Sequence, residues 1–178
     1  MHLWNIVFVG GFMWESEGFA QEDQGAIYTS IDRKDCLTID TSEWGGEFED
    51  YYSAECPGVG GYRVFISGGD LRYNLSLGYQ GQLIEGYRLL QFHNMGAAKI
   101  EWRYARRKDT AQVAYKALIY RLSYPQMDSE KARELSMLVV MRLQGKKSCV
   151  IGIIEQQKDM NQKARALAQN TSIGCMEL

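Results

Sequence analysis

Residues 62–79 read YRVFISGGDLRYNLSLGY, and this stretch decides the fold class. Residues 62–67 are rich in β-branched and aromatic side chains, and the Gly-Gly-Asp of residues 68–70 is typical of a hairpin turn. In residues 71–79 apolar and polar side chains alternate, so that the Leu and Tyr side chains share one face of a strand. Because a strand with one buried face is typical of an antiparallel sheet, we expect an antiparallel hairpin here.

The rest of the chain adds several strands and few helices. Further strands are expected at residues 99–105, 111–123, 135–143 and 148–155. Apolar residues at helical spacing predict a short helix over residues 82–90 and a longer one over residues 158–170. Residues 15–26 and 125–134 are expected to be polar segments outside the sheet. This order favours an α+β domain, a twisted antiparallel sheet of about six strands packed by one or two helices.

The chain has 178 residues and a formal net charge of −2, a length that fits one domain with a sizeable core. Residues 22–55 contain ten acidic and two basic side chains, a net charge of −8, whereas residues 56–178 contain eighteen basic and ten acidic ones, a net charge of +8. We interpret this division as internal complementarity, with an acidic N-terminal lobe lying against a basic sheet. No apolar run reaches the roughly 18 residues that a transmembrane helix requires.

The first twenty residues have features of a secretory signal peptide. Residues 3–14 are apolar except for Asn5, and the Gly-Phe-Ala of residues 18–20 places small residues before a cleavage after Ala20. No Lys or Arg precedes Arg33, so the usual positive charge at the start is missing, and the alternative is an N-terminal strand of the domain. We predict a signal peptide over residues 1–20, a single domain over residues 21–178, and a periplasmic or secreted protein.

The cysteines support an oxidising compartment. The chain has four of them, Cys36, Cys56, Cys149 and Cys175, without the closely spaced pairs that are typical of structural zinc sites. Four cysteines allow three pairings. We favour Cys36–Cys56 and Cys149–Cys175, because each pair brackets one local unit of the chain. The alternative is four reduced, buried thiols in a cytoplasmic protein.

Few residues support a metal, a cofactor or nucleophilic catalysis. Of the two histidines, His2 is lost with the signal peptide, so that any Ser-His-Asp or Cys-His triad depends on His93 alone. One histidine cannot supply a multi-histidine zinc site. The Gly-Val-Gly-Gly of residues 58–61 lacks both the phosphate-loop and the dinucleotide-binding pattern. We therefore expect no metal and no cofactor.

A carboxylate-based hydrolase is the remaining enzymatic hypothesis. Glu47, Glu49 and Asp50 lie near Trp44, and Asp70 is a further acidic residue. A glycosidase-like site needs two such carboxylates to face each other across a pocket about 5–10 Å wide. Clustered acids in a glycine-containing loop are more often solvated, so this hypothesis is the least favoured.

Basic side chains are the candidates for binding a partner. They are Arg72, Arg103, Arg106, Arg107 and Lys108. A basic hairpin tip attracts an acidic protein or another polyanion, and the alternative is a solvated turn. Alternation places Trp102 and Tyr104 on the face opposite Arg103, in the core, so that they offer no stacking platform for nucleic-acid bases.

The order of these features resembles a family of uncharacterised exported proteins of proteobacteria. The most specific matches are the Cys-Pro-Gly-x-Gly-Gly-Tyr of residues 56–62, the Gly-Asp-Leu-Arg of residues 69–72 and the Glu-Trp-Arg of residues 101–103. The resemblance covers roughly residues 26–175. It implies an exported soluble domain with the cysteines as a framework, and it implies no particular activity.

We expect an exported, non-enzymatic binding or inhibitor-like domain of the cell envelope. Its partner would be an envelope protein or an anionic envelope component rather than a nucleic acid, and the chain would be a monomer or a weak dimer. A structural or assembly component of the envelope is the alternative, and the hydrolase is less favoured.

Overall fold

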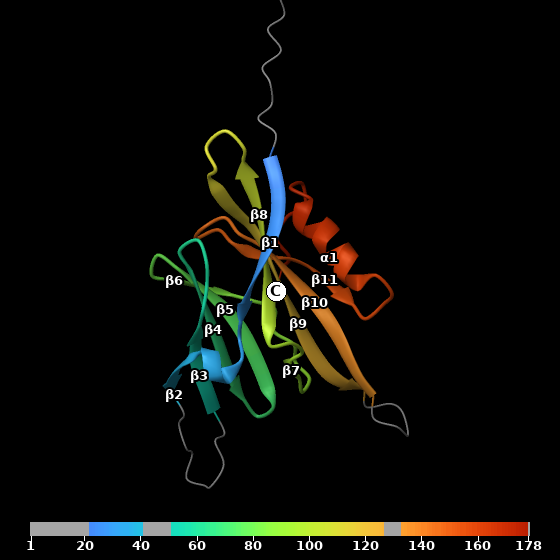
Figure 1. The fold of residues 1–178 in the computed structure, drawn as a ribbon. Helices are drawn as coiled ribbons and strands as arrows, with labels where there is room; N and C mark the ends of the chain where they lie inside the picture. The colour runs from blue at the N-terminus through green and yellow to red at the C-terminus, as the bar shows by residue number, and fades with distance from the viewer. Residues whose placement is uncertain (1–21, 41–50, 127–132, 178) are drawn as a thin grey trace, which may run out of the picture.

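A computed structural model describes residues 22–40, 51–126 and 133–177, which form two antiparallel sheets and a helix (Figure 1). The six-stranded sheet has the spatial order β1 (Glu22–Ser30), β8 (Lys99–Arg107), β9 (Val113–Gln126), β10 (Arg133–Arg142) and β11 (Cys149–Glu155), with β7 (Asn94–Met95) also paired to β9. The five-stranded sheet has the order β2 (Leu37–Asp40), β3 (Tyr51–Cys56), β4 (Tyr62–Gly69), β5 (Arg72–Tyr79) and β6 (Gln82–Glu85). A 3-10 helix, η1 (Arg33–Asp35), lies between β1 and β2, and α1 (Met160–Gln169) follows β11. The α+β class is confirmed, but the strands form two sheets where one was expected.

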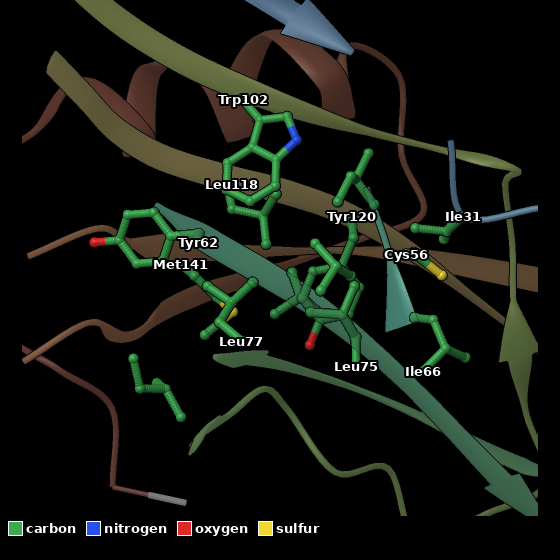
Figure 2. Packing of buried hydrophobic residues seen from close by; sticks show 14 of the residues in the cluster. Ile31, Cys56, Tyr62, Ile66, Leu75, Leu77, Trp102, Leu118, Tyr120 and Met141 are labelled. Atoms are coloured by element: carbon green, nitrogen blue, oxygen red, sulfur yellow. The ribbon is translucent and has the colours of Figure 1, made fainter. Parts of the chain in front are cut away.

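The main core lies between the two sheets (Figure 2). From the five-stranded sheet, Leu75 and Leu77 of β5 point into this core and are fully buried. From the six-stranded sheet, Trp102 of β8 and Tyr120 of β9 meet them and are also fully buried. Burial of this apolar surface is the main favourable contribution to folding.

The central strands of the six-stranded sheet are buried on both faces. Residues 117–120 of β9 and residues 137–141 of β10 are buried without interruption. Alternate side chains face the five-stranded sheet, and the others, such as Ile119 and Val140, form a second cluster with Met160 and Ala164 of α1. A strand covered on both faces requires a continuous apolar run, which these two segments have.

The predicted hairpin of residues 62–79 is confirmed as β4 and β5, with a turn that differs in detail. Gly69 pairs with Arg72, so the two turn residues are Asp70 and Leu71, with φ values of 50° and 58°. Positive φ at both central positions is the type I′ geometry, whose twist matches that of the flanking strands. Leucine rarely adopts this conformation, which makes Leu71 a strained position.

The prediction of a helix over residues 82–90 is wrong. A second tight turn at Gln80 and Gly81, with φ values of 48° and 79°, pairs Tyr79 with Gln82 and extends the sheet into β6. Leu83 and Leu90 are 58% and 90% exposed, so the residues at helical spacing do not form one buried face. The helix predicted over residues 158–170 is confirmed as α1, which buries Met160 and Ala164.

The polar segments also differ from expectation. Residues 22–26 belong to β1, which pairs with β8 along its whole length, because the edge of β8 offers unpaired backbone groups. Strand β9 extends to Gln126 and β10 begins at Arg133. Residues 1–20, the predicted signal peptide, lie outside the described residues.

The described parts of the acidic segment, residues 22–40 and 51–55, lie within the two sheets and beside them and do not form a separate lobe. In the six-stranded sheet, β1 places Glu22 opposite Arg107 and Asp23 opposite Arg106. In the five-stranded sheet, Glu55 of β3 accepts two hydrogen bonds from Arg63, each 2.6 Å. In these described residues, charge complementarity is therefore distributed along neighbouring strands of both sheets.

Both predicted disulfides are confirmed. Cys36, just before β2, is bonded to Cys56 at the end of β3, with a Cα–Cα distance of 4.2 Å. Cys149, at the start of β11, is bonded to Cys175 beyond α1, with a Cα–Cα distance of 5.7 Å. The described residues contain no free cysteine.

We predict that the double substitution Cys149→Ser/Cys175→Ser lowers the free energy of unfolding by about 3 kcal/mol, because the bond closes a loop of this size in the unfolded chain. Urea denaturation of the oxidised proteins measures the change. The reduced wild-type protein serves as a control and should lose at least as much stability, since both bonds are then open. An unchanged midpoint in the double variant would contradict the prediction.

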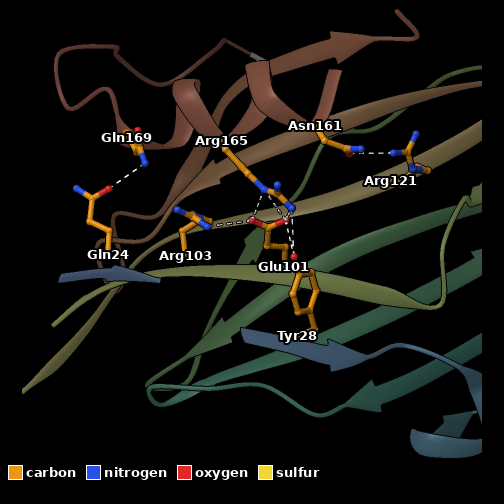
Figure 3. Close-up of polar contacts among 8 residues, drawn as sticks. All are labelled: Gln24, Tyr28, Glu101, Arg103, Arg121, Asn161, Arg165 and Gln169. Atoms are coloured by element: carbon orange, nitrogen blue, oxygen red, sulfur yellow. Dashed lines mark hydrogen bonds and ion pairs between the residues drawn. The ribbon is translucent and has the colours of Figure 1, made fainter. Parts of the chain in front are cut away.

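An ion pair connects α1 to the sheet (Figure 3). Arg165 of α1 donates from Nε and Nη2 to the carboxylate of Glu101 on β8, with distances of 2.9–3.2 Å. The Tyr28 hydroxyl of β1 donates to the same carboxylate at 3.2 Å. Burial alone would raise the pKa of Glu101, but the hydrogen bonds and positive charge of Arg165, aided by Tyr28 and Arg103, lower it below the ordinary value.

We predict that Glu101→Gln removes part of the acid sensitivity of the fold. Because the pKa of Glu101 is lower in the folded chain than in the unfolded chain, its stabilising effect is present at neutral pH and is lost as the pH falls through the folded value. At pH 7 the variant should be less stable by about 1–2 kcal/mol, as for a charge-assisted hydrogen bond with partial exposure. Urea midpoints measured from pH 7 to about pH 3 should decline less steeply than those of the wild type.

Glu85→Gln is the matched control, because Glu85 forms an exposed ion pair with Arg88 at 2.7 Å. Its effect should lie within about 0.5 kcal/mol at every pH. Equal pH profiles for the wild type and Glu101→Gln would contradict the role given to this pair.

Candidate ligand-binding pocket

The predicted basic binding residues lie at opposite ends of the molecule. Residues 106–108 stand at the β8–β9 turn, uppermost in Figure 1, whereas Arg72 follows the β4–β5 turn at the lower end. Arg103 lies within β8 and has a side chain that is only 17% exposed. The structure therefore does not bring these residues together as one surface.

Several of these side chains are engaged within the chain. Arg107 donates from Nε and Nη2 to the carboxylate of Asp109, at 3.2 and 2.7 Å. The guanidinium of Arg106 lies 5.7 Å from the ring centroid of Tyr104. An arginine whose guanidinium already donates to a carboxylate has fewer N–H groups available to bind a partner.

A pocket of about 820 Å³ lies at the lower end of the molecule, between the two sheets. Both sheets, η1 and the segment before β7 contribute to its wall. It is lined by Ile31, Arg33, Tyr52, Ile66, Leu71, Tyr73, Phe92, His93, Asn94, Met95, Ser123, Tyr124, Pro125, Arg133 and Glu134. A large, mostly apolar pocket with a few polar groups is the usual form of a small-molecule site.

Tyr52 supplies an unusual polar group to this wall. Its ring is buried in the main core, and its hydroxyl is buried without a hydrogen-bond partner among the described residues. The guanidinium of Arg33 stacks over the ring, 4.4 Å from its centroid. A buried hydroxyl without a partner costs free energy, and an acceptor on a ligand would remove that cost.

His93 and Arg72 hold one wall of the pocket in place. The two ring nitrogens of His93 lie 2.7 Å from the carbonyl oxygens of Gln91 and Tyr73, and its backbone N–H donates to the Leu71 carbonyl at 2.9 Å. Arg72 contacts Asp70 and donates from Nε to the Leu90 carbonyl at 3.0 Å. These two side chains therefore bind the segment before β7 to β5.

The mouth of the pocket carries exposed apolar surface and charges. Leu71 is 68% exposed and Phe92 is 40% exposed, and the guanidinium of Arg72 lies 4.9 Å from the centroid of the Phe92 ring. Partial burial and, to a smaller extent, the negative charge of Glu155 raise the pKa of the Tyr124 phenol. That hydroxyl therefore remains a hydrogen-bond donor at physiological pH.

Of the carboxylates proposed for hydrolysis, Asp70 is the one that lies in the described residues, and it does not line this pocket. Asp70 stands exposed in the β4–β5 turn and pairs with Arg72. Glu47, Glu49 and Asp50 lie outside the described residues. Within the described ranges, no three His, Cys, Asp or Glu side chains are placed to hold a metal ion.

No family model, curated protein or solved structure matches this chain. The resemblance to exported proteobacterial proteins therefore stays a prediction. In the part of the chain that the structure describes, no helix is long and apolar enough to cross a membrane.

Sequence reasoning did not identify this pocket. Its residues come from separate strands, and Arg33 and Tyr52 lie in the acidic segment that was interpreted only by its charge. The clearest available signal was the pair of adjacent tyrosines, Tyr51 and Tyr52, at the start of a strand, where alternation exposes one ring and buries the next.

We predict that His93→Phe loosens the wall of the pocket. The substitution removes the imidazole whose two nitrogens contact the carbonyls of Gln91 and Tyr73, which should lower the free energy of unfolding by about 1–3 kcal/mol. Hydrogen exchange of the Leu71–Tyr73 amides should accelerate more than exchange in β9. Gln91→Ala is the control, because Gln91 contributes only its carbonyl and should change stability by about 0.5 kcal/mol or less. Equal effects of the two substitutions would contradict the role of the imidazole.

Proposed function

We propose that this chain is a non-enzymatic binding protein, periplasmic or secreted, that holds a small amphiphile in the pocket between the two sheets. The apolar body of the ligand lies against the core side chains, and its anionic head lies near Tyr52 and Arg33. The observation that carries the proposal is the buried Tyr52 hydroxyl, which has no hydrogen-bond partner among the described residues and belongs to a residue that lines a mostly apolar pocket.

The size and composition of the pocket support an amphiphile. At about 820 Å³ it lies in the range of sites that enclose drug-sized molecules. Ile31, Ile66 and Met95 supply apolar surface in its wall. Burying an alkyl chain against such a surface contributes about 0.8 kcal/mol per methylene group.

The charged residues of the lining favour an anionic head. Arg33 and Arg133 are basic, and Glu134 is the single acidic side chain among the described lining residues. Arg33 stacks over Tyr52, so a carboxylate that accepts from the Tyr52 hydroxyl would lie beside a guanidinium. This ligand class agrees with the anionic envelope component expected from the sequence.

Two disulfides support export, since such bonds persist in oxidising compartments. The resemblance to exported proteobacterial proteins points in the same direction. A structural role in the envelope and a hydrolase activity remain sequence-based alternatives, and no contact among the described residues favours either.

The test measures binding of 1-anilinonaphthalene-8-sulfonate, an aromatic dye with one anionic group, by its fluorescence. We expect saturable binding by the folded wild-type chain and displacement by dodecanoate at lower concentration than by dodecanol. Tyr52→Phe should weaken dodecanoate binding about three- to tenfold, the loss expected for one hydrogen bond. Because the hydroxyl has no hydrogen-bond partner in the described part of the chain, the same substitution should not lower stability.

Tyr51→Phe is the matched control. Tyr51 is the preceding residue of β3, is 38% exposed and faces away from the core. Its loss should leave dodecanoate affinity unchanged. A wild-type chain that is folded by near-ultraviolet circular dichroism but fails to bind the dye would overturn the proposal. Equal dodecanoate affinities for Tyr51→Phe and Tyr52→Phe would also overturn it.

A further inference from the structure

A second pocket, of about 300 Å³, lies on the opposite face of the six-stranded sheet, beside the C-terminal end of α1. It is lined by Gln24, Arg103, Tyr104, Ala105, Lys116, Arg142, Leu143, Gln144, Ala168, Gln169, Asn170 and Thr171. Three of these residues are basic and none is acidic. The pocket shares no lining residue with the amphiphile pocket.

Strand register explains why the basic side chains converge. Arg103 of β8 and Arg142 of β10 both pair with Ala117 of β9, so the three side chains form a row on the face that α1 covers farther along. Residues directly opposite one another project from the same face of a sheet. Ala117 has only a methyl group, which leaves room between the two arginines. The register shift between Arg103 and Tyr104 brings Lys116 to the same place.

One edge of the Arg103 guanidinium makes no hydrogen bond within the described ranges of the chain. Its Nη1 donates to Glu101 at 3.3 Å, but its Nε is buried with no hydrogen bond among the described residues. Nε and Nη2 form the edge that binds carboxylates and phosphates with two parallel hydrogen bonds. Arg63 and Arg107 use this edge on Glu55 and Asp109.

Positive charge is incompletely balanced around this edge. Arg103 pairs with Glu101, and the same carboxylate also accepts hydrogen bonds from Nε and Nη2 of Arg165 (Figure 3). Two arginines therefore share one negative charge. Arg142 directs Nη2 to the Asn170 carbonyl at 3.0 Å, a neutral acceptor. A guanidinium that is mostly buried and only partly paired is costly unless another anion approaches it.

We infer that this second pocket binds a small oxyanion, such as a phosphate group. The Nε–Nη2 edge of Arg103 receives two oxygens of the anion, and Lys116 and Arg142 add positive charge. The side-chain amides of Gln24 and Gln169, hydrogen-bonded to each other at 2.9 Å, border the site. This oxyanion site does not depend on the amphiphile pocket.

The experiment titrates the full chain with inorganic phosphate by isothermal titration calorimetry, with sodium chloride at equal ionic strength as the reference. The wild type should show saturable binding of phosphate. Lys116→Gln, which removes an exposed side chain and should not affect folding, should weaken binding about three- to tenfold. Arg103→Lys keeps the charge but loses the two-donor edge, and it should weaken binding about tenfold or more.

Arg107→Gln is the matched control. Arg107 lies outside the pocket and its guanidinium already donates to Asp109, so this substitution should not change phosphate affinity. Tyr52→Phe should also leave phosphate binding unchanged, which separates this site from the amphiphile pocket. Phosphate binding no stronger than that of chloride, or equal weakening by Lys116→Gln and Arg107→Gln, would overturn the inference.

Discussion

Both faces of the six-stranded sheet must be buried, and the rest of the structure depends on this constraint. Strands β9 and β10 have continuous apolar segments that no single cover can remove from water. The five-stranded sheet covers one face, and α1 covers the other. A pocket lies beside each cover, one between the two sheets and one at the end of α1. The two candidate sites are therefore consequences of how the sheet is covered.

Covalent and ionic contacts hold each cover to the sheet or to itself. Cys36–Cys56 joins the segment before β2 to β3 within the five-stranded sheet, and Cys149–Cys175 joins the segment after α1 to β11. The pair between Arg165 and Glu101 holds the middle of α1 to β8. By occupying both oxygens of Glu101, Arg165 leaves Arg103 incompletely neutralised, so the contact that secures the helix also makes the neighbouring pocket attractive to an anion.

Local patterns predicted the elements whose neighbours in sequence are also their neighbours in space. The hairpin of residues 62–79, the helix of residues 158–170 and both disulfides follow from alternation, spacing and bracketing within short segments. The prediction for residues 82–90 was wrong because a tight turn at Gln80 and Gly81 outweighed helical spacing. Residues 22–26 have no strong strand pattern and became part of β1 because the edge of β8 was available for pairing.

The sequence by itself determined the antiparallel class, the late helix and the disulfide framework, because alternation, helical periodicity and cysteine spacing are local properties of the chain. Only the tertiary structure decided that there are two sheets and where ligands can bind. Arg33 of η1 lies over Tyr52 of β3 beside one pocket, and Arg103 and Arg142 flank Ala117 through the pairings of β8 and β10 with β9. Such pairings depend on which apolar faces bury one another, and a single strand does not encode its partner.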